Sequence, residues 1–250
     1  AQTKRWKEAV AWFDRAVALR GNAAAVYNNR ANALRNMERM AESLRDYDRA
    51  IALAPDYVEA IRNRGNLLRR QGRLDEALAS YTRAVELAPG DAVTYHAMGN
   101  AYAKMGRDAD ALRCFERAIA LRDDFADAHN NLGVAYKNLG QFEQALASYA
   151  RAIELRPDFS EAYCNRGNLL GMMKRHAEAL SDYDRALALR EENADAHNNR
   201  ATQCNELKHF EEALASSERA IALNPENIEA HNNRAVALAG MGRKTGALSG

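Results

Sequence analysis

The sequence predicts an all-α protein made of a repeated pair of antiparallel helices. The first observation is that Pro55, Pro89, Pro157 and Pro225, the only prolines among 250 residues, share one place in a 34-residue frame. The second is that small, aromatic and leucine residues also recur at fixed places of this frame. The third is that apolar residues inside each frame follow the three- and four-residue spacing of an amphipathic helix. A period of this length indicates a helical repeat protein.

The frame divides the chain completely when Ala24 is taken as its first place. Partial repeats then occupy residues 1–23 and 228–250. Between them lie six full repeats, at 24–57, 58–91, 92–125, 126–159, 160–193 and 194–227. We therefore treat the chain as a single array.

Recurrent residues indicate how the two helices of a repeat pack. Alanine dominates the twentieth place, is constant at the twenty-seventh, and is followed by a constant leucine at the thirtieth. The eighth place is always small: Ala31, Gly65, Gly99, Gly133, Gly167, Ala201 and Ala235. The twenty-fourth is aromatic in six of seven cases: Phe13, Tyr47, Tyr81, Phe115, Tyr149 and Tyr183, with Ser217 as the exception. Small residues allow close helix approach, and the aromatic ring fills the space beside them.

The repeat 126–159 illustrates the order of elements. Leu132 and Tyr136 belong to the apolar stripe of its first helix. Gly140 is expected to end that helix, because glycine readily takes the left-handed conformation of a C-terminal cap. A second stripe contains Tyr149, and Pro157 then prevents the second helix from continuing. One such hairpin cannot bury both of its faces, so neighbouring repeats are expected to stack.

The two ends are expected to be incomplete repeats. Residues 4–20 form a second helix without its first, with Trp6, Val10 and Phe13 turned inward. Residues 228–250 supply a first helix and stop inside a second, near Gly246 and Gly250. Two interpretations remain open: the chain is a segment of a longer protein, or its end helices serve as caps.

This pattern of small, aromatic, alanine and proline residues at period 34 resembles the tetratricopeptide repeat family across the whole chain. The resemblance implies a right-handed superhelix of stacked helical hairpins, with the first helices along a concave groove. It also implies a protein–protein interaction scaffold with no catalytic residues of its own.

Asparagines recur at groove-facing places. An asparagine amide has two donors and one acceptor, so it can bind a peptide backbone without reading the side chains. Helices about 8–10 Å apart would meet an extended chain about every third residue. The candidate ligand contacts at the sixth and ninth places are Asn29, Asn63, Asn131, Asn165, Asn199 and Asn233, with Asn66, Asn100 and Asn168. Such a ladder resembles that of O-linked N-acetylglucosamine transferases and SPINDLY proteins. Alternatively, these amides satisfy local backbone groups.

Charge at the groove-facing places is uneven. The cations are Arg35, Arg62, Arg69, Arg70, Lys104 and Lys137, of which Arg35, Arg69, Lys104 and Lys137 join the candidate ligand contacts. The later repeats carry the carboxylates Glu161, Asp195, Glu206 and Glu229. A surface basic at one end and acidic at the other would orient a partner. The alternative is that these charges are simply solvated.

Arginine at the seventh place is expected to form structural ion pairs. In an antiparallel hairpin, Arg30 lies opposite Asp46, and Arg166 lies opposite Asp182. Arg64 and Arg200 are expected to face only serines.

Several functional classes have no support in the sequence. His129, His197 and His231 occupy one place in separate repeats, so they are too far apart to share a metal and are expected to be half-buried packing residues. No glycine-rich phosphate loop or nucleophile signature occurs, so neither a cofactor nor catalysis is expected. The net charge of +1 argues against a nucleic-acid partner. No apolar run is long enough to span a membrane. Three cysteines without a CxxC pair favour a reducing, cytoplasmic compartment.

The predicted function is therefore a scaffold that binds an extended peptide segment of a protein partner in its groove. One alternative is the substrate-recruiting domain of a larger glycosyltransferase. Another is self-association through the terminal helices, where Trp6 and Leu248 would expose apolar faces.

Overall fold

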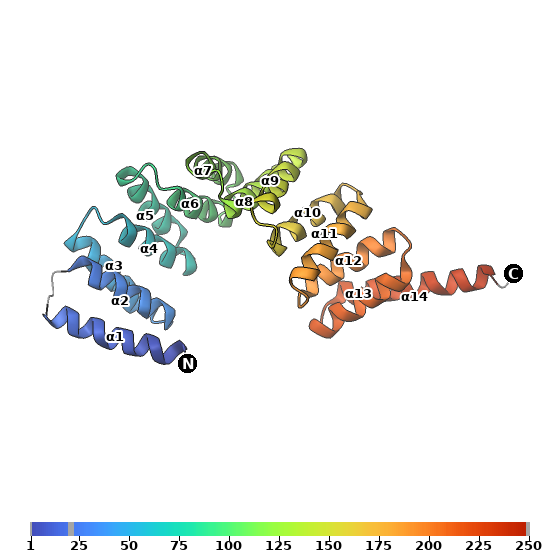
Figure 1. The fold of residues 1–250 in the computed structure, drawn as a ribbon, viewed down its shortest axis with the longest axis horizontal. Coiled ribbons are helices and arrows are strands. Elements are labelled where there is room, and N and C mark those ends of the chain that lie inside the picture. Colours follow the sequence, from blue (N-terminus) through green and yellow to red (C-terminus); the bar gives the residue numbers. More distant parts are fainter. Residues whose placement is uncertain (1, 20–22, 249–250) are drawn as a thin grey trace. The chain divides into compact units, whose positions relative to one another are not determined.

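The computed structural model describes the backbone of residues 2–19 and 23–248, and the side chains of residues 5–19 and 23–242. Every regular element in this part of the chain is an α-helix, and fourteen helices follow one another (Figure 1). The predicted all-α array of helical hairpins is confirmed.

The chain divides into two compact units, Ala1–Asp123 and Asp124–Gly250. The first contains α1 (Gln2–Leu19), α2 (Ala24–Asn36), α3 (Met40–Leu53), α4 (Val58–Arg70), α5 (Leu74–Leu87), α6 (Ala92–Lys104) and α7 (Asp108–Leu121). The second contains α8 (Ala126–Asn138), α9 (Phe142–Leu155), α10 (Ser160–Met172), α11 (His176–Leu189), α12 (Ala194–Glu206), α13 (Phe210–Leu223) and α14 (Ile228–Leu248).

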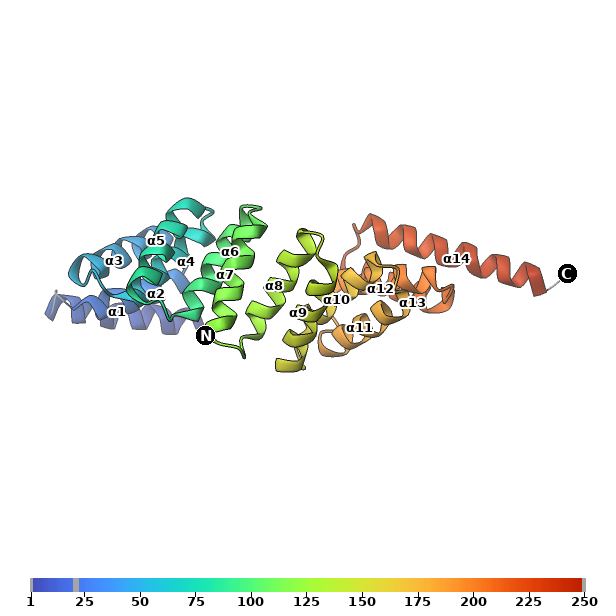
Figure 2. The same cartoon turned by 90° about the horizontal axis from the view of Figure 1, so that it is seen from above.

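Helix contacts within each unit distinguish an inner from an outer side. In the first unit, α2 pairs with α3, α4 with α5, and α6 with α7, and each second helix also contacts the next first helix. Successive first helices are in contact with each other, for example α2 with α4. Successive second helices are not in contact in the described parts of either unit. The first helices are therefore the more closely spaced set, and they form the inner side of each unit. The paired helices can be followed in Figures 1 and 2.

The core of five of the six full repeats is an aromatic ring packed on a small residue of the opposite helix, as the sequence predicts, and Ser217 takes its place in the repeat 194–227. Tyr47, Tyr81, Phe115, Tyr149 and Tyr183 are all at most 1% exposed. A Cβ atom added at Gly133 would lie 2.6 Å from Cε1 of Tyr149, so the glycine leaves the space that the ring fills. This packing holds the two helices of one hairpin together.

The turn inside each full repeat depends on a left-handed residue at the fifteenth place. Gly72, Gly106 and Gly140 have φ between 71° and 78°, which confirms the expected role of Gly140. The same place holds Glu38, Lys174 and Lys208, each with φ of 60°. A left-handed conformation costs a residue with a Cβ atom about 1–2 kcal/mol, so these three turns are strained.

We expect Lys208→Gly to stabilise the second unit by about 0.5–1 kcal/mol, because relief of the left-handed strain exceeds the extra entropy of an unfolded glycine. Lys208 is exposed at the end of α12, so little packing is lost. Urea unfolding followed by circular dichroism measures the change. The reverse variant Gly140→Lys is the matched control and should destabilise the second unit by a similar amount. If both variants changed its stability in the same direction, the explanation by left-handed strain would be wrong.

The two terminal helices differ in how well they match expectation. In α1, Val10 is 7% exposed and packs with Trp6, Phe13 and Leu34, which confirms the predicted inward face. In contrast, α14 continues unbroken past Gly240 and Gly242, where a turn into a second helix was expected. The side chains of Gly246, Leu248 and Gly250 lie outside the described residues.

Candidate peptide-binding surface

The candidate site is the inner surface, which we define as places 2, 5, 6, 9, 12 and 13 of the first helices. In the second unit, Thr202, Ile228, Glu229, Asn232 and Asn233 line a hollow of about 540 Å³ on this surface.

Three of the four asparagines at the fifth place are buried and join successive repeats, whereas Asn232 is exposed. Asn28, Asn130 and Asn198 are only 0%, 1% and 4% exposed. Each accepts a hydrogen bond from the sixth-place asparagine of the next repeat, with Nδ2 to Oδ1 distances of 3.1 Å from Asn63, 3.0 Å from Asn165 and 2.9 Å from Asn233. Each also donates to a carboxylate of that repeat, namely Glu59, Glu161 and Glu229. The predicted ladder is therefore partly a set of bonds between repeats.

The other sixth-place asparagines accept hydrogen bonds from their fifth-place neighbours. Asn29 is exposed and accepts from Asn28 over 3.4 Å, and Asn131 accepts from Asn130 over 3.2 Å. Asn199 accepts from Asn198 over 3.3 Å and donates to Asn168 over 2.9 Å. These amides are half-buried or exposed and are held in place by their neighbours.

Ninth-place asparagines are oriented by the buried tyrosines. The hydroxyls of Tyr47, Tyr81 and Tyr183 donate to Oδ1 of Asn32, Asn66 and Asn168 over 2.6, 2.8 and 2.6 Å. Because the oxygen receives the tyrosine proton, the amide NH₂ group is the part left for other partners. Asn100 lacks a tyrosine and lies 3.5 Å from Nε2 of His96. These tyrosine–asparagine pairs were not predicted, although both residues recur fifteen positions apart.

Cations without ion pairs gather on the inner surface of the first unit. Arg35, Arg69, Arg70 and Lys104 form no salt bridge with any described residue of this unit. Burial raises the pKa of Tyr47 and Tyr81, and the nearby charges of Arg35 and Arg69 oppose that rise. Arg62 differs, because it lies 2.6 Å from Asp91 and is neutralised.

The inner surface of the second unit carries the opposite charge. Glu161, Asp195, Glu206 and Glu229 lie on its first helices, and Lys137 on α8 is the cation at these places. Asp127, also at an inner place, is paired with Arg156 over 2.5 Å.

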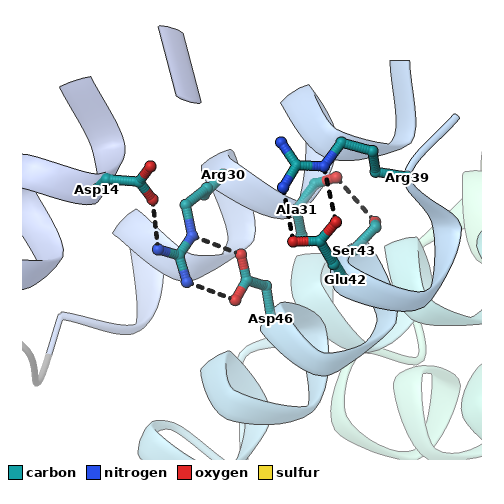
Figure 3. A network of polar contacts seen from close by, with 7 residues as sticks. All are labelled: Asp14, Arg30, Ala31, Arg39, Glu42, Ser43 and Asp46. Carbon is teal, nitrogen blue, oxygen red and sulfur yellow. Dashed lines mark hydrogen bonds and ion pairs between the residues drawn. The ribbon is translucent and has the colours of Figure 1, made fainter. Parts of the chain in front are cut away.

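Seventh-place arginines point to the outer side, where they form structural ion pairs. Nε and Nη2 of Arg30 donate to Asp46 over 2.6 and 2.7 Å (Figure 3). The Arg166–Asp182 pair has the same geometry, with distances of 2.8 and 2.7 Å. Both predicted pairs are confirmed.

The prediction that Arg64 and Arg200 face only serines was wrong. They contact Ser80 and Ser216, but they also lie 2.6 Å from Asp48 and Asp184 of the preceding repeat. The pairing rule within one hairpin omits carboxylates of the previous second helix, which pack against the same arginine. These arginines therefore join successive repeats on the outer side.

The recurrent histidines and the cysteine at an inner place were the remaining candidates for reactive groups. Nε2 of His197 and His231 lies 3.0 Å from backbone oxygens of Glu191 and Pro225, and His231 is exposed, so the expected half-burial was wrong for that residue. Burial raises the pKa of Cys164 to about 11, which keeps this half-buried thiol protonated near neutral pH.

The described residues contain neither a cluster of metal ligands nor a helix suited to a bilayer. No three His, Cys, Asp or Glu side chains there converge in a way that would hold a metal ion. None of the helices there combines the length and apolar character needed to cross a bilayer.

Comparison with protein-family models gives matches along most of the chain. Residues 22–90, 56–124, 126–159 and 160–193 match models described as tetratricopeptide repeat, and residues 203–242 match one described as TPR repeat. Among curated protein sequences, none matches significantly.

Solved structures with the same fold are numerous. A crystal structure of the APC/C hetero-tetramer Cut9–Hcn1 matches with a TM-score of 0.77 at 19% identity, over 93% of this chain and 46% of the other. This chain thus spans about half the length of that neighbour. YrrB, described as a TPR protein with an unusual peptide-binding site, matches with a TM-score of 0.61 at 28% identity, over 74% of this chain and 96% of its own. MamA matches with a TM-score of 0.60 at 26% identity, over 64% and 94%.

Proposed function

The chain belongs to the tetratricopeptide repeat family, whose repeats indicate a protein–protein interaction scaffold, and we propose that its inner surface binds an extended segment of a partner protein. In this proposal the chain is not itself an enzyme. Its binding surface is made of fixed amides and charged side chains rather than of an enclosed pocket.

One observation carries the proposal: the inner surface presents polar groups that the fold itself does not use. The amide NH₂ groups of Asn32, Asn66 and Asn168 are oriented by tyrosines, and cations without ion pairs lie beside them in the first unit. Ordered donors that are already fixed cost little entropy when a ligand binds. The description of YrrB as having a peptide-binding site supports the same use of a similar fold.

The proposed contacts are those that line the inner surface. Asn63, Asn165, Asn199 and Asn233 contribute less than the others, because their NH₂ groups already bind the preceding repeat. The full proposed set is Asn29, Asn63, Asn131, Asn165, Asn199, Asn233, Asn66, Asn100, Asn168, Arg35, Arg69, Lys104 and Lys137.

Photo-crosslinking tests the proposal without disturbing the bonds between repeats. A photoreactive phenylalanine analogue is placed at Arg70 or Glu206, which are exposed at inner places of the two units. The matched controls carry it at Arg83 or Arg185, which are exposed on second helices. A library of unstructured peptides is screened for binding, and the best binders are irradiated with each variant.

We expect crosslinks from the inner positions at least about tenfold above those from the controls, since effective contact requires proximity. Crosslinks mainly from Arg83 or Arg185 would show that peptides bind the outer side. A library without any binder would also contradict the proposal.

A further inference from the structure

We propose that the inner surface of the first unit selects acidic segments, whose side-chain carboxylates are held by two Asn–Arg pairs: Asn32 with Arg35 on α2, and Asn66 with Arg69 on α4. This inference rests on the proposed function, because it names the chemistry of the segment that would bind at that surface.

The two members of each pair lie on one face of one helix. Residues three apart on a helix are neighbours, so the amide of Asn66 and the guanidinium of Arg69 converge on the same region. The hydroxyl of Tyr81 donates to Oδ1 of Asn66, so the NH₂ group is the part of this amide that remains for a ligand. A guanidinium has donors and no acceptor. Each pair therefore presents donors alone, and its natural ligand is an acceptor such as a carboxylate.

The arginines lack an anionic partner. Nε of Arg69 is buried and makes no hydrogen bond within the described residues. A buried donor of this kind is costly until an acceptor reaches the same group. Planar guanidinium groups bind carboxylates through two parallel bonds, which makes such contacts strong and directional. Arg69 is therefore the central contact of the proposed site.

The surrounding charge favours an acid over a neutral ligand. Arg70 and Lys104 are exposed at the thirteenth place of α4 and α6 and add two cations. Glu59 is the one carboxylate at the inner places of this unit, and it already accepts from Asn28 over 3.3 Å. In the second unit, the corresponding places hold Val134 with Lys137, Asn168 with Gly171, and Thr202 with Asn205. The Asn–Arg pair is thus specific to the first unit.

The repeat spacing indicates how the acids are arranged. First helices that touch are about 8–10 Å apart, and an extended chain rises about 3.3 Å per residue. Side chains on one face of that chain recur every second residue. Carboxylates two residues apart would therefore reach Arg35 and Arg69 together, because arginine side chains are long enough to absorb the difference in spacing.

A nucleic acid is the competing polyanion, and the inner surface suits it less well. Proteins that bind single strands stack the bases on aromatic side chains. The inner places of the first unit contain no Phe, Tyr or Trp, and the recurrent rings of Tyr47, Tyr81 and Phe115 are buried in the core. Tyr57 adjoins these places, and its hydroxyl accepts from Asn28 over 3.3 Å.

The test measures binding of the whole chain to a fluorescent twelve-residue peptide of alternating Glu and Gly, capped at both ends. A peptide with Gln in place of Glu, and a twelve-nucleotide single-stranded DNA, are compared with it by fluorescence anisotropy. The double variant Arg35→Gln, Arg69→Gln is matched by Arg49→Gln, Arg83→Gln, which removes the same charge from exposed positions on α3 and α5. Circular dichroism verifies that both variants fold.

We expect the Glu peptide to bind at least about tenfold more tightly than the Gln peptide, with a loss of about tenfold for each inner arginine removed. The outer double variant should stay within about threefold of the wild type. If the two double variants lost affinity for the Glu peptide equally, the attraction would depend only on the overall charge of the protein, and the proposal would be overturned. Tighter binding of the DNA through the same arginines would overturn it as well.

The outcomes also separate this inference from the proposed function. If Glu and Gln peptides bind equally and both lose affinity in the inner variant, acidic selectivity is wrong while the inner surface still binds peptides. If neither peptide binds, the acidic-segment proposal is wrong, and the photo-crosslinking screen decides the broader one. If both bind and only the outer variant weakens them, both proposals are wrong.

Discussion

Tyr149→Ala is expected to lower the stability of the second unit by about 3–5 kcal/mol, the range for removal of a fully buried aromatic ring. The ring is 0% exposed and lies against Gly133, where even one added carbon would come within 2.6 Å of it. Neither helix can close the resulting cavity easily, because both are also packed against neighbouring repeats. Urea unfolding should show the loss, and amide hydrogen exchange should place it in α8 and α9, since repeat proteins distribute stability between nearest neighbours.

The hydroxyl of this residue should behave in the opposite way. Its oxygen is buried and has no hydrogen-bond partner among the described residues, because Val134 occupies the place that Asn32, Asn66 and Asn168 hold in other repeats. Tyr149→Phe should therefore be neutral or stabilise the unit by about 1 kcal/mol. In contrast, Tyr81→Phe breaks a 2.8 Å bond to Asn66 and should cost about 1 kcal/mol. A loss of similar size in both phenylalanine variants would contradict the assignment.

These packing features explain how much the sequence could predict. The 34-residue period locates the helices, the ring on its glycine and the turn at Gly140, because each depends on one residue type at one place. The turn at Lys208 was not foreseen, since lysine gives no sign of a left-handed backbone. Contacts between repeats were the weakest part of the prediction.

The candidate site shows the same limit. Periodicity predicts that asparagines line the inner side, but it cannot show that Asn28 is buried and bonded to Asn63 of the next repeat. Nor can it show that Tyr81 orients Asn66, because that depends on how a side chain crosses between two helices. The charges were easier to predict, yet Arg62 proved to be neutralised by Asp91 at the end of the same repeat.

Asp182→Ala is the second large effect that we expect, a loss of about 2–3 kcal/mol from the second unit. Asp182 is 7% exposed as a side chain and is the only salt-bridge partner of Arg166 among the described residues. Breaking a buried ion pair costs about 3–5 kcal/mol because it leaves one charge uncompensated. Arg166 is 26% exposed, so water partly solvates its charge and the expected loss lies at or below the lower end of that range. Asp184 is the matched control. It is 52% exposed, so Asp184→Ala should cost at most about 1 kcal/mol.

Asp46→Ala should fall between these two variants and so tests the explanation. Its partner Arg30 keeps a second acid, Asp14, at 2.8 Å (Figure 3), so the guanidinium is not left alone. In the second unit, Ala150 occupies the place that corresponds to Asp14, and Arg166 has no such substitute. Urea unfolding of the three alanine variants should therefore rank Asp182 above Asp46 and Asp46 above Asp184. If Asp46 and Asp182 cost the same, the acid from the preceding repeat contributes nothing, and the outer arginines act within single hairpins rather than between them.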